Sequence, residues 1–225
     1  RDQVVRELAE LTGITTVDQD HGAIAVFTGR GHPLVTGNTV SELQAVANPF
    51  DPTRLEIANS AGFNITATLT GGSIGGLLSF RAQILDPSAN ALGRVAAGLV
   101  ETVNAQHRLG LDFNGNLGTD FFASAPPSVT ANSANAGGTV TGALLDVSAL
   151  ATSDYTLLFN GGTSYTLSRE SDGQTTAIDT LGASPFTTAA IDGFSLTITA
   201  GAVAGDSFRV RPVADSAALM SVAIT

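Results

Sequence analysis

Residues Gly71–Phe122 read GGSIGGLLSFRAQILDPSANALGRVAAGLVETVNAQHRLGLDFNGNLGTDFF, a glycine-rich start followed by a helical run and a loop rich in Asn and Asp. Four apolar residues at helical spacing predict a short first helix: Leu77, Leu78, Ile84 and Leu85. Asp86-Pro87 predicts the start of a second helix, because Asp is a favoured N-cap residue and Pro suits the first helical position. No part of the stretch has the spacing of a catalytic site, so it points to a structural element.

The second helix is predicted to run to about His107, which gives a length of roughly 30 Å at 1.5 Å per residue. A stripe with steps of three and four residues contains Leu92, Val95, Leu99, Val103 and Gln106, with Ala96 beside Val95, and is apolar up to Val103. Small residues on its sides allow neighbouring segments to approach closely. We expect Leu92, Val95, Leu99 and Val103 to pack against the rest of the chain or, as the alternative, to form a contact with another subunit on a second face.

The residues before this stretch predict one helix and several short strands. Residues 1–12, RDQVVRELAELT, have helical spacing, and Gly13 is a natural residue to end that helix. Asp20-His21-Gly22 predicts a hairpin turn between the strands ITTVDQ and AIAVFTG. The remaining segments are a turn at 29–33, a rigid loop at 48–52, and strands at 55–57 and 63–69.

Ala123-Ser124-Ala125-Pro126-Pro127 marks a boundary, after which almost every segment reads as a short strand. Asn160–Thr163 predicts a hairpin turn between two alternating runs. Strands of this size with turns every ~8–12 residues are typical of a small antiparallel sandwich or barrel. The sequence therefore predicts an α+β, mostly β fold with two domains, a mixed helix and hairpin domain at 1–123 and a β-rich domain at 128–225.

Composition restricts the partners of this 225-residue chain, which carries 10 basic residues, all arginine, against 20 acidic ones, a net charge of −10. Nucleic acids and anionic membranes need clustered cations, so we expect neither as a partner. The chain has no cysteine, which excludes disulfides, zinc–thiolate sites and thiol catalysis. No run of 18 apolar residues and no cationic signal peptide is present.

Three groups of residues are candidates for binding chemistry. Asp112, Asn114 and Asn116, with Asp120, offer alternating oxygen ligands for a weak calcium site, but the positions of the calcium-loop Gly and Glu hold Leu117 and Ala123, which favours an Asx turn. The Gly71–Gly76 run favours a flexible connection over a phosphate cradle, because the Lys-Ser/Thr ending is missing. Arg209 and Arg211 share one strand face and either bind an acidic partner or form a surface ion-pair cluster. We expect no catalytic residue, no cofactor and no metal.

Several segments, in order along the chain, resemble the flagellar hook-associated protein 1 family: Arg1–Leu8, Ile24–Val35 (IAVFTGRGHPLV), Gly75–Phe122, Tyr155–Leu158 and Gly205–Val222 (GDSFRVRPVADSAALMSV). The resemblance implies a non-enzymatic adaptor of the bacterial flagellum, located outside the cell at the hook–filament junction. It implies the hook protein, the next junction protein or filament subunits, and other copies in a ring as partners. It also implies flagellar type III export without a cleaved signal peptide.

The resemblance further implies that this is a central fragment without the family's terminal helices, so we expect it to be a monomer or a weak oligomer in isolation. Two other interpretations remain open. The acidic, Ser/Thr-rich second half suits a secreted adhesin-like β-module that binds a surface or glycan. A polysaccharide hydrolase needs paired carboxylates and aromatic residues for sugar stacking, and the chain has no Trp and two Tyr.

Overall fold

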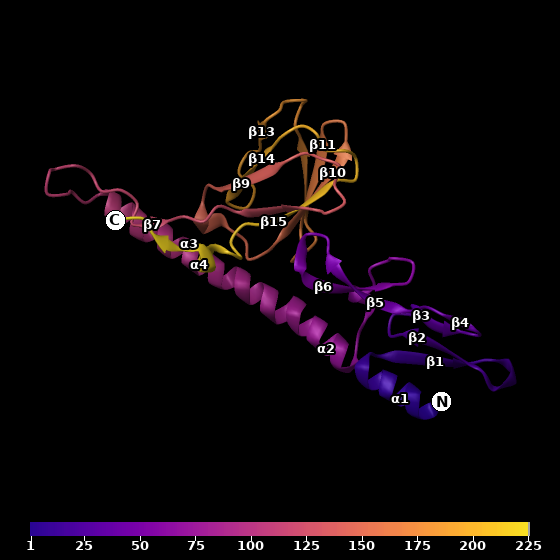
Figure 1. The fold of residues 1–225 in the computed structure, drawn as a ribbon. Helices are drawn as coiled ribbons and strands as arrows, with labels where there is room; N and C mark the ends of the chain where they lie inside the picture. Colours follow the sequence, from indigo (N-terminus) through magenta and orange to yellow (C-terminus); the bar gives the residue numbers. More distant parts are fainter. Residues whose placement is uncertain (225) are drawn as a thin grey trace. The chain divides into compact units, whose positions relative to one another are not determined.

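The chain forms two compact units, Arg1–Leu85 and a second unit that starts at Asp86 (Figure 1). The computed structural model describes residues 1–224, and of these every side chain except that of His21. Helices and antiparallel sheets alternate along the chain, which confirms the predicted α+β, mostly β fold class. The contacts divide the chain at Leu85, whereas the sequence predicts a boundary at 123–127, because the long helix packs with the second unit.

The first unit consists of a short helix, two small sheets and a second helix. Helix α1 (Asp2–Leu11) and the hairpin of β1 (Ile14–Asp18) and β2 (Ile24–Thr28) form where the sequence predicts them. Strands β3 (Pro33–Thr36) and β4 (Thr39–Val40) extend this sheet in the order β1-β2-β3-β4, and β5 (Leu43–Asn48) pairs with β6 (Asp51–Asn59). The buried apolar side chains of the unit are few: Ala25, Val26, Leu34, Ala58, Ile65 and Leu69.

Two local predictions in this unit are wrong. Residues 63–69 do not form a strand, because the Asn64 Oδ1 accepts from the Thr66 N–H at 2.9 Å and the chain turns into the 3-10 helix η2 (Thr66–Thr68). The other concerns only the reason for Gly13, since α1 ends directly before it, at Leu11 with Thr12 as C-cap, as predicted. The Gly13 N–H donates to the Thr70 carbonyl at 2.8 Å, and an added Cβ would lie 2.2 Å from that oxygen, so close backbone approach requires the glycine.

Helix α3 begins at Asp86, as predicted, but no break in the helix precedes it. Helix α2 (Gly72–Phe80), the π turn η3 (Arg81–Leu85) and α3 (Asp86–Arg108) follow one another with no non-helical residue between them. A proline inside a helix lacks the N–H and crowds the carbonyl four residues earlier, and the wider π turn directly before Pro87 accommodates both effects. Gly71, with φ of 75°, is the N-cap of α2, so the glycine run is mostly helix and not a flexible connection.

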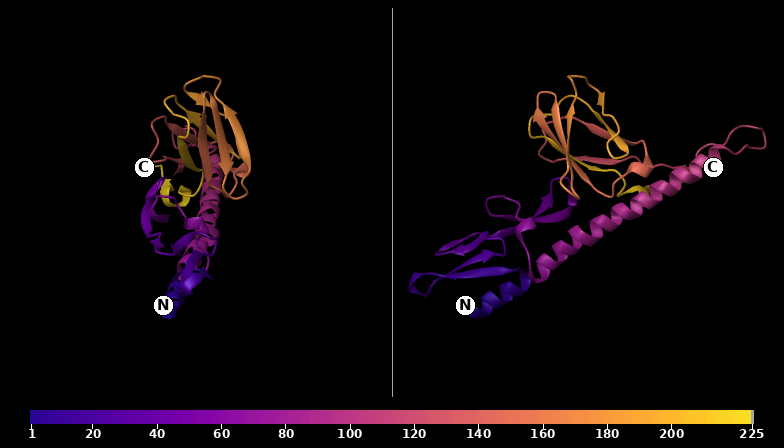
Figure 2. Two further views of the ribbon diagram at one scale, coloured as in Figure 1. Left: turned by 90° about the vertical axis from the view of Figure 1, so that its right-hand side faces the viewer. Right: turned by 180° about the vertical axis from the view of Figure 1, so that it is seen from behind.

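The second unit is a β-sandwich beside α3, as the sequence predicts for its strands (Figure 2). A five-stranded sheet has the order β12-β11-β10-β15-β8, and a three-stranded sheet has the order β13-β14-β9. The bounds are β8 (Ser128–Ala131), β9 (Val140–Leu144), β10 (Tyr155–Gly161), β11 (Ser164–Arg169), β12 (Thr175–Asp179), β13 (Phe186–Thr187), β14 (Phe194–Ile198) and β15 (Ser207–Arg211).

One apolar core lies between these two sheets. Its fully buried members come from both: Tyr155, Leu157, Leu167, Phe194, Leu196, Phe208 and Val210. The ring centroids of Tyr155 and Phe194 lie 5.0 Å apart in an edge-on arrangement that joins the sheets. Shorter elements complete the unit: β7 (Phe122–Ala123) paired with β16 (Ser221–Val222), the turn η4 (Val147–Ala149) and helix α4 (Ser216–Leu219).

Candidate functional site

Helix α3 buries a narrow face of small and polar residues. The buried positions step by three and four residues apart from the adjacent pair Ala96 and Ala97: Asn90, Gly93, Ala96, Ala97, Val100 and Asn104. An added Cβ on Gly93 would lie 1.8 Å from the Val213 carbonyl oxygen, so the helix lies directly on the backbone that follows β15. The Asn104 amide donates to the Phe122 carbonyl and accepts from the Phe122 N–H, both at 2.8 Å, and holds β7 against the helix.

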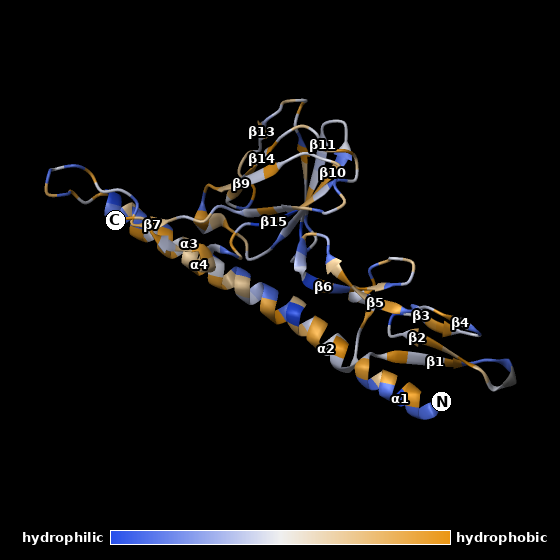
Figure 3. Ribbon diagram, in the orientation of Figure 1, coloured by the Kyte–Doolittle hydropathy of each residue, from blue (hydrophilic) through white to orange (hydrophobic). Residues whose placement is uncertain are grey.

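The predicted apolar stripe lies on another face of the same helix. Leu92, Val95 and Leu99 are 62%, 69% and 48% exposed, while Val103 is half-buried. Apolar and polar residues alternate along α2 and α3 (Figure 3). Large apolar side chains are also exposed on α2 and the π turn: Leu77, Phe80, Ile84 and Leu85. The prediction that Leu92, Val95 and Leu99 pack against the rest of the chain is therefore wrong for the described residues. The alternative, that they contact another subunit, stays a prediction.

The cations of Arg209 and Arg211 are held by acids of the same chain. Their side chains are 17% and 27% exposed, and both guanidinium groups face the buried carboxylate of Asp154, at 3.3 and 3.4 Å. Arg209 also pairs with Glu170 at 2.8 Å and Arg211 with Asp215 at 3.3 Å. This geometry favours an ion-pair cluster within the chain over a surface that binds an acidic partner.

The Asp112 loop forms an Asx turn. Asp112 Oδ1 accepts from the N–H groups of Asn114 and Asn116 at 2.8 Å, and its Oδ2 accepts from the Asn116 amide at 3.0 Å. These bonds, first that from the Asn116 side chain, lower the pKa of the Asp112 carboxyl. Asp120 is paired with Arg108 at 2.5 Å. The predicted calcium ligands are thus engaged by N–H donors, and no group of three or more His, Cys, Asp or Glu gathers in the described part of the chain.

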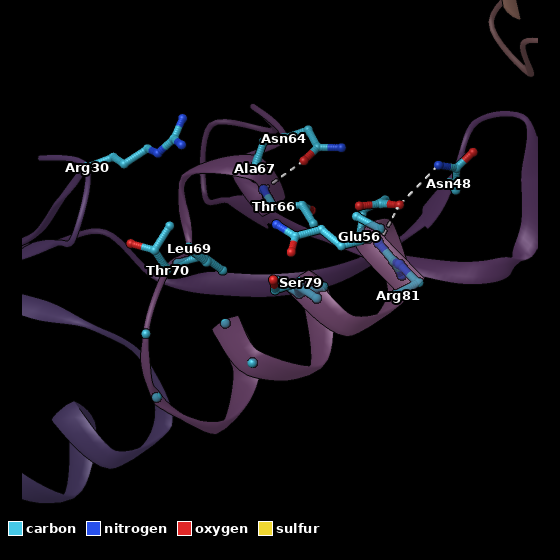
Figure 4. Close-up of a pocket in the computed structure, with 17 residues that line it drawn as sticks. Arg30, Asn48, Glu56, Asn64, Thr66, Ala67, Leu69, Thr70, Ser79 and Arg81 are labelled. Carbon is cyan, nitrogen blue, oxygen red and sulfur yellow. Dashed lines mark hydrogen bonds and ion pairs between the residues drawn. The ribbon is translucent and has the colours of Figure 1, made fainter. Parts of the chain in front are cut away.

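A concave site of the first unit is a groove between α2 and the segment that runs from β6 to η2 (Figure 4). It has a volume of about 820 Å³, which lies in the ~300–1,000 Å³ range of ligand sites. Arg30 lies at one end and the pair of Glu56 and Arg81 at the other (Figure 4). Gly71, Gly72, Gly75 and Gly76 line the groove with backbone in place of side chains.

The buried carboxylate of Glu56 organises its end of the groove. Glu56 Oε1 accepts from Arg81 and from the Asn48 amide, both at 3.1 Å, and a second nitrogen of Arg81 donates to the Leu55 carbonyl at 3.0 Å. Burial raises the pKa of Glu56, but hydrogen bonds from Thr66 and Asn48 and the charge of Arg81 outweigh burial, so the pKa lies below its ordinary value.

Sequence reasoning missed this groove. Its residues come from five separate segments between Arg30 and Gln83, and only the glycine run drew attention, as a connection or a phosphate cradle. The Gly29-Arg30-Gly31 turn gives a weak signal, an arginine between two glycines.

No helix in the described residues is long and apolar enough to cross a membrane.

Two models of known protein families together match most of the chain. Residues 1–122 match the family model described as the flagellar hook-associated protein FlgK helical domain, and residues 129–212 match the flagellar hook-associated protein 1, D2-like domain. Flagellar hook-associated protein 1 of Salmonella typhimurium (strain LT2) is 38% identical over 242 residues, covering 100% of this chain and 41% of the relative. The Escherichia coli (strain K12) relative is 36% identical and is covered to 42%.

The fold agrees with these sequence matches. The solved structure of the flagellar hook junction protein FlgK from Burkholderia pseudomallei superimposes with a TM-score of 0.87 at 36% identity, over 100% of this chain and 42% of that one. The chain spans about two fifths of the length of the curated relatives that it matches. The resemblance seen in the sequence is confirmed, and the chain belongs to the flagellar hook-associated protein 1 family.

Proposed function

We propose that this chain is part of a structural component of the bacterial flagellum that acts as an adaptor between hook and filament. The observation that carries the proposal is the family match, which extends over the whole chain at 36–38% identity. Its partners are the hook protein on one side, the next junction protein or filament subunits on the other, and further copies in a ring. The protein works outside the cell and is exported by the flagellar type III route, which the resemblance to the family implies.

The mechanism is geometric: one surface matches the hook and another matches the filament, and no bond is made or broken. The exposed apolar stripe of α3 supports this mechanism, because Leu92, Val95 and Leu99 face solvent in the described chain. Large exposed apolar surfaces of soluble proteins mark sites of interaction. We assign the stripe to contacts that form in the complete, assembled protein.

The relatives support a structural role over the other two interpretations. Their names describe a hook-associated and a hook junction protein, and none of these names states a catalytic activity. The adhesin-like interpretation gains no support, because the α3 region that it left unexplained is part of the match to the FlgK helical domain at residues 1–122.

A chimera tests the proposal. The matching segment of the Salmonella typhimurium relative is replaced by this chain and expressed in cells that lack their own copy. We expect swimming and filament growth to return. A matched chimera with Val95→Asp and Leu99→Asp is expected to be exported but to assemble poorly. A folded, exported chimera that never becomes part of the flagellum would contradict the proposal.

A further inference from the structure

We propose that the groove of the first unit binds the acidic tip of the β1–β2 hairpin, residues 18–22, from a second copy of the chain. This inference rests on the proposed function, since a ring needs a contact between neighbouring copies. It deepens that function by naming the two surfaces that meet. Both surfaces lie in the first unit.

The groove carries one uncompensated positive charge. Its charged lining residues are Arg30, Glu56 and Arg81, and the last two form an ion pair at 3.1 Å. Within the described residues, no hydrogen bond or ion pair holds the guanidinium group of Arg30, which is exposed at one end of the groove (Figure 4). A carboxylate is the natural partner for this cation, and bidentate pairing is open to it.

The rest of the lining offers hydrogen-bond donors to a chain segment. The Asn64 Oδ1 is used by the Thr66 N–H, which leaves the Asn64 amide nitrogen to donate outward. The polar groups of Ser79 and Gln83 are exposed on the same lining. An added Cβ on Gly76 would meet nothing within 4 Å, so the backbone of a bound segment can approach the helix closely at this point.

The hairpin tip has the complementary charge. Asp18 and Asp20 are both exposed, and neither carboxylate takes part in an ion pair within the described residues. The nearby cation, Arg1, donates to the Gly22 carbonyl at 2.8 Å and is paired with Asp2 at 3.0 Å, so it does not neutralise them. The tip thus presents two free carboxylates on a narrow, protruding turn.

The tip of one copy does not reach its own groove. In the β1–β2 ladder Asp18 pairs with Ile24 at the tip, and Ile14 pairs with Thr28 at the other end, next to Arg30. Four strand steps of ~3.4 Å separate the two ends by about 14 Å. The contact is therefore between copies and head-to-tail, the kind of contact that closes into a ring when its rotation fits.

Disulfide trapping tests this contact, because the chain has no cysteine of its own. One sample carries Gln19→Cys at the tip and another carries Ser79→Cys in the groove. We expect the mixed, oxidised samples to form a covalent dimer roughly tenfold faster than a control mixture of Gln19→Cys with Ala105→Cys, an exposed position on α3, since opposite charges steer association.

Charge exchange separates a specific contact from random collision. Arg30→Glu in the groove copy is expected to remove the advantage over the control, and Asp18→Arg with Asp20→Arg in the tip copy is expected to do the same. Combining the two reversed copies is expected to restore it. The contact would be overturned if the dimer formed at the control rate. It would also be overturned if the rate stayed the same in the reversed groove copy, in the reversed tip copy and in their combination. Such a failure leaves the proposed function standing, because labelling of the protein on cells, described below, tests that separately.

Discussion

Gly93 is the residue where α3 has no room for a side chain. We predict that Gly93→Ala destabilises the second unit by about 3 kcal/mol or more, because the new Cβ would lie 1.8 Å from the Val213 oxygen. Gly98→Ala is the matched control on the same helix. Its Cβ meets nothing within 4 Å, so this change is expected to stabilise the helix by about 0.5–1 kcal/mol. Urea unfolding followed by circular dichroism measures both, and equal effects would contradict the packing described here.

Glu56 makes the first unit sensitive to acid. Its pKa in the folded protein lies below the ordinary value of 4.5, so its stabilising effect is complete above about pH 4.5 and is lost as the pH falls through the lowered pKa. We predict that Glu56→Gln costs about 1–2 kcal/mol at pH 7, less than for a fully buried pair because Arg81 is 24% exposed. The difference from the unchanged protein should shrink towards pH 3. Urea titrations of both proteins, followed by the amide signals of β6, check this, and a pH-independent difference would argue against the ion pair.

The local arrangement of polar residues could be predicted from the sequence, but their long-range partners could not. The sequence indicates an Asx turn at Asp112 and a shared face for Arg209 and Arg211, and the structure contains both. That Asp154 lies beneath both arginines could not be read from the sequence, since it is 55 residues from Arg209 and their meeting depends on strand order. Long-range ion pairs of this kind follow from topology and leave no local pattern.

The same Val→Asp substitution is expected to change stability very differently on the two faces of α3. Val100 is 6% exposed and Val95 is 69% exposed. We expect Val100→Asp to destabilise the second unit by at least about 3 kcal/mol, because a charge enters the core, and Val95→Asp to change stability by no more than about 0.5 kcal/mol. Thermal melting of the two variants is the measurement. A large loss for Val95→Asp would mean that the stripe packs within the chain after all.

Helix position was predicted well, but the buried face of the helix was not. Residues Leu92, Val95, Leu99 and Val103 repeat at helical spacing, and so do Gly93, Ala97, Val100 and Asn104. Large apolar residues were expected inside, but the backbone after β15 approaches α3 so closely that only small residues fit there. The prediction of a strand at 63–69 was wrong because of a contact that the apolar pattern does not reveal. The alternating pattern predicts a strand, but the Thr66 N–H donates to the Asn64 side chain and the chain turns into η2.

The two compact units differ in how much apolar surface they bury. The contiguous core cluster includes aromatic side chains of both sheets of the second unit, such as Tyr155, Phe194 and Phe208. The buried apolar side chains described in the first unit are aliphatic: Ala25, Val26, Leu34, Ala58, Ile65 and Leu69. We predict that the amides of β2 and β6 exchange with solvent faster than those of β10 and β14, because local stability follows buried apolar contacts. Hydrogen exchange followed by mass spectrometry checks this, and slower exchange in the first unit would contradict it.

The family of the chain was predictable because its similarity is distributed over many segments in a fixed order. No single motif carries it, and the family models match residues 1–122 and 129–212. From charge and composition we expect neither a nucleic acid nor an anionic membrane as a partner, but these properties do not identify the partner. The surfaces that we propose to assemble, the α3 stripe and the groove beside α2, could be identified only once side-chain exposure was known.

Immunogold electron microscopy of intact flagellated cells tests the central proposal most directly. Antibody raised against this chain is applied to cells of the organism that produces it. A junction adaptor predicts gold label confined to a narrow band where the hook meets the filament. Label spread over the cell body or along a fimbria would contradict the proposal and would return attention to the adhesin-like interpretation.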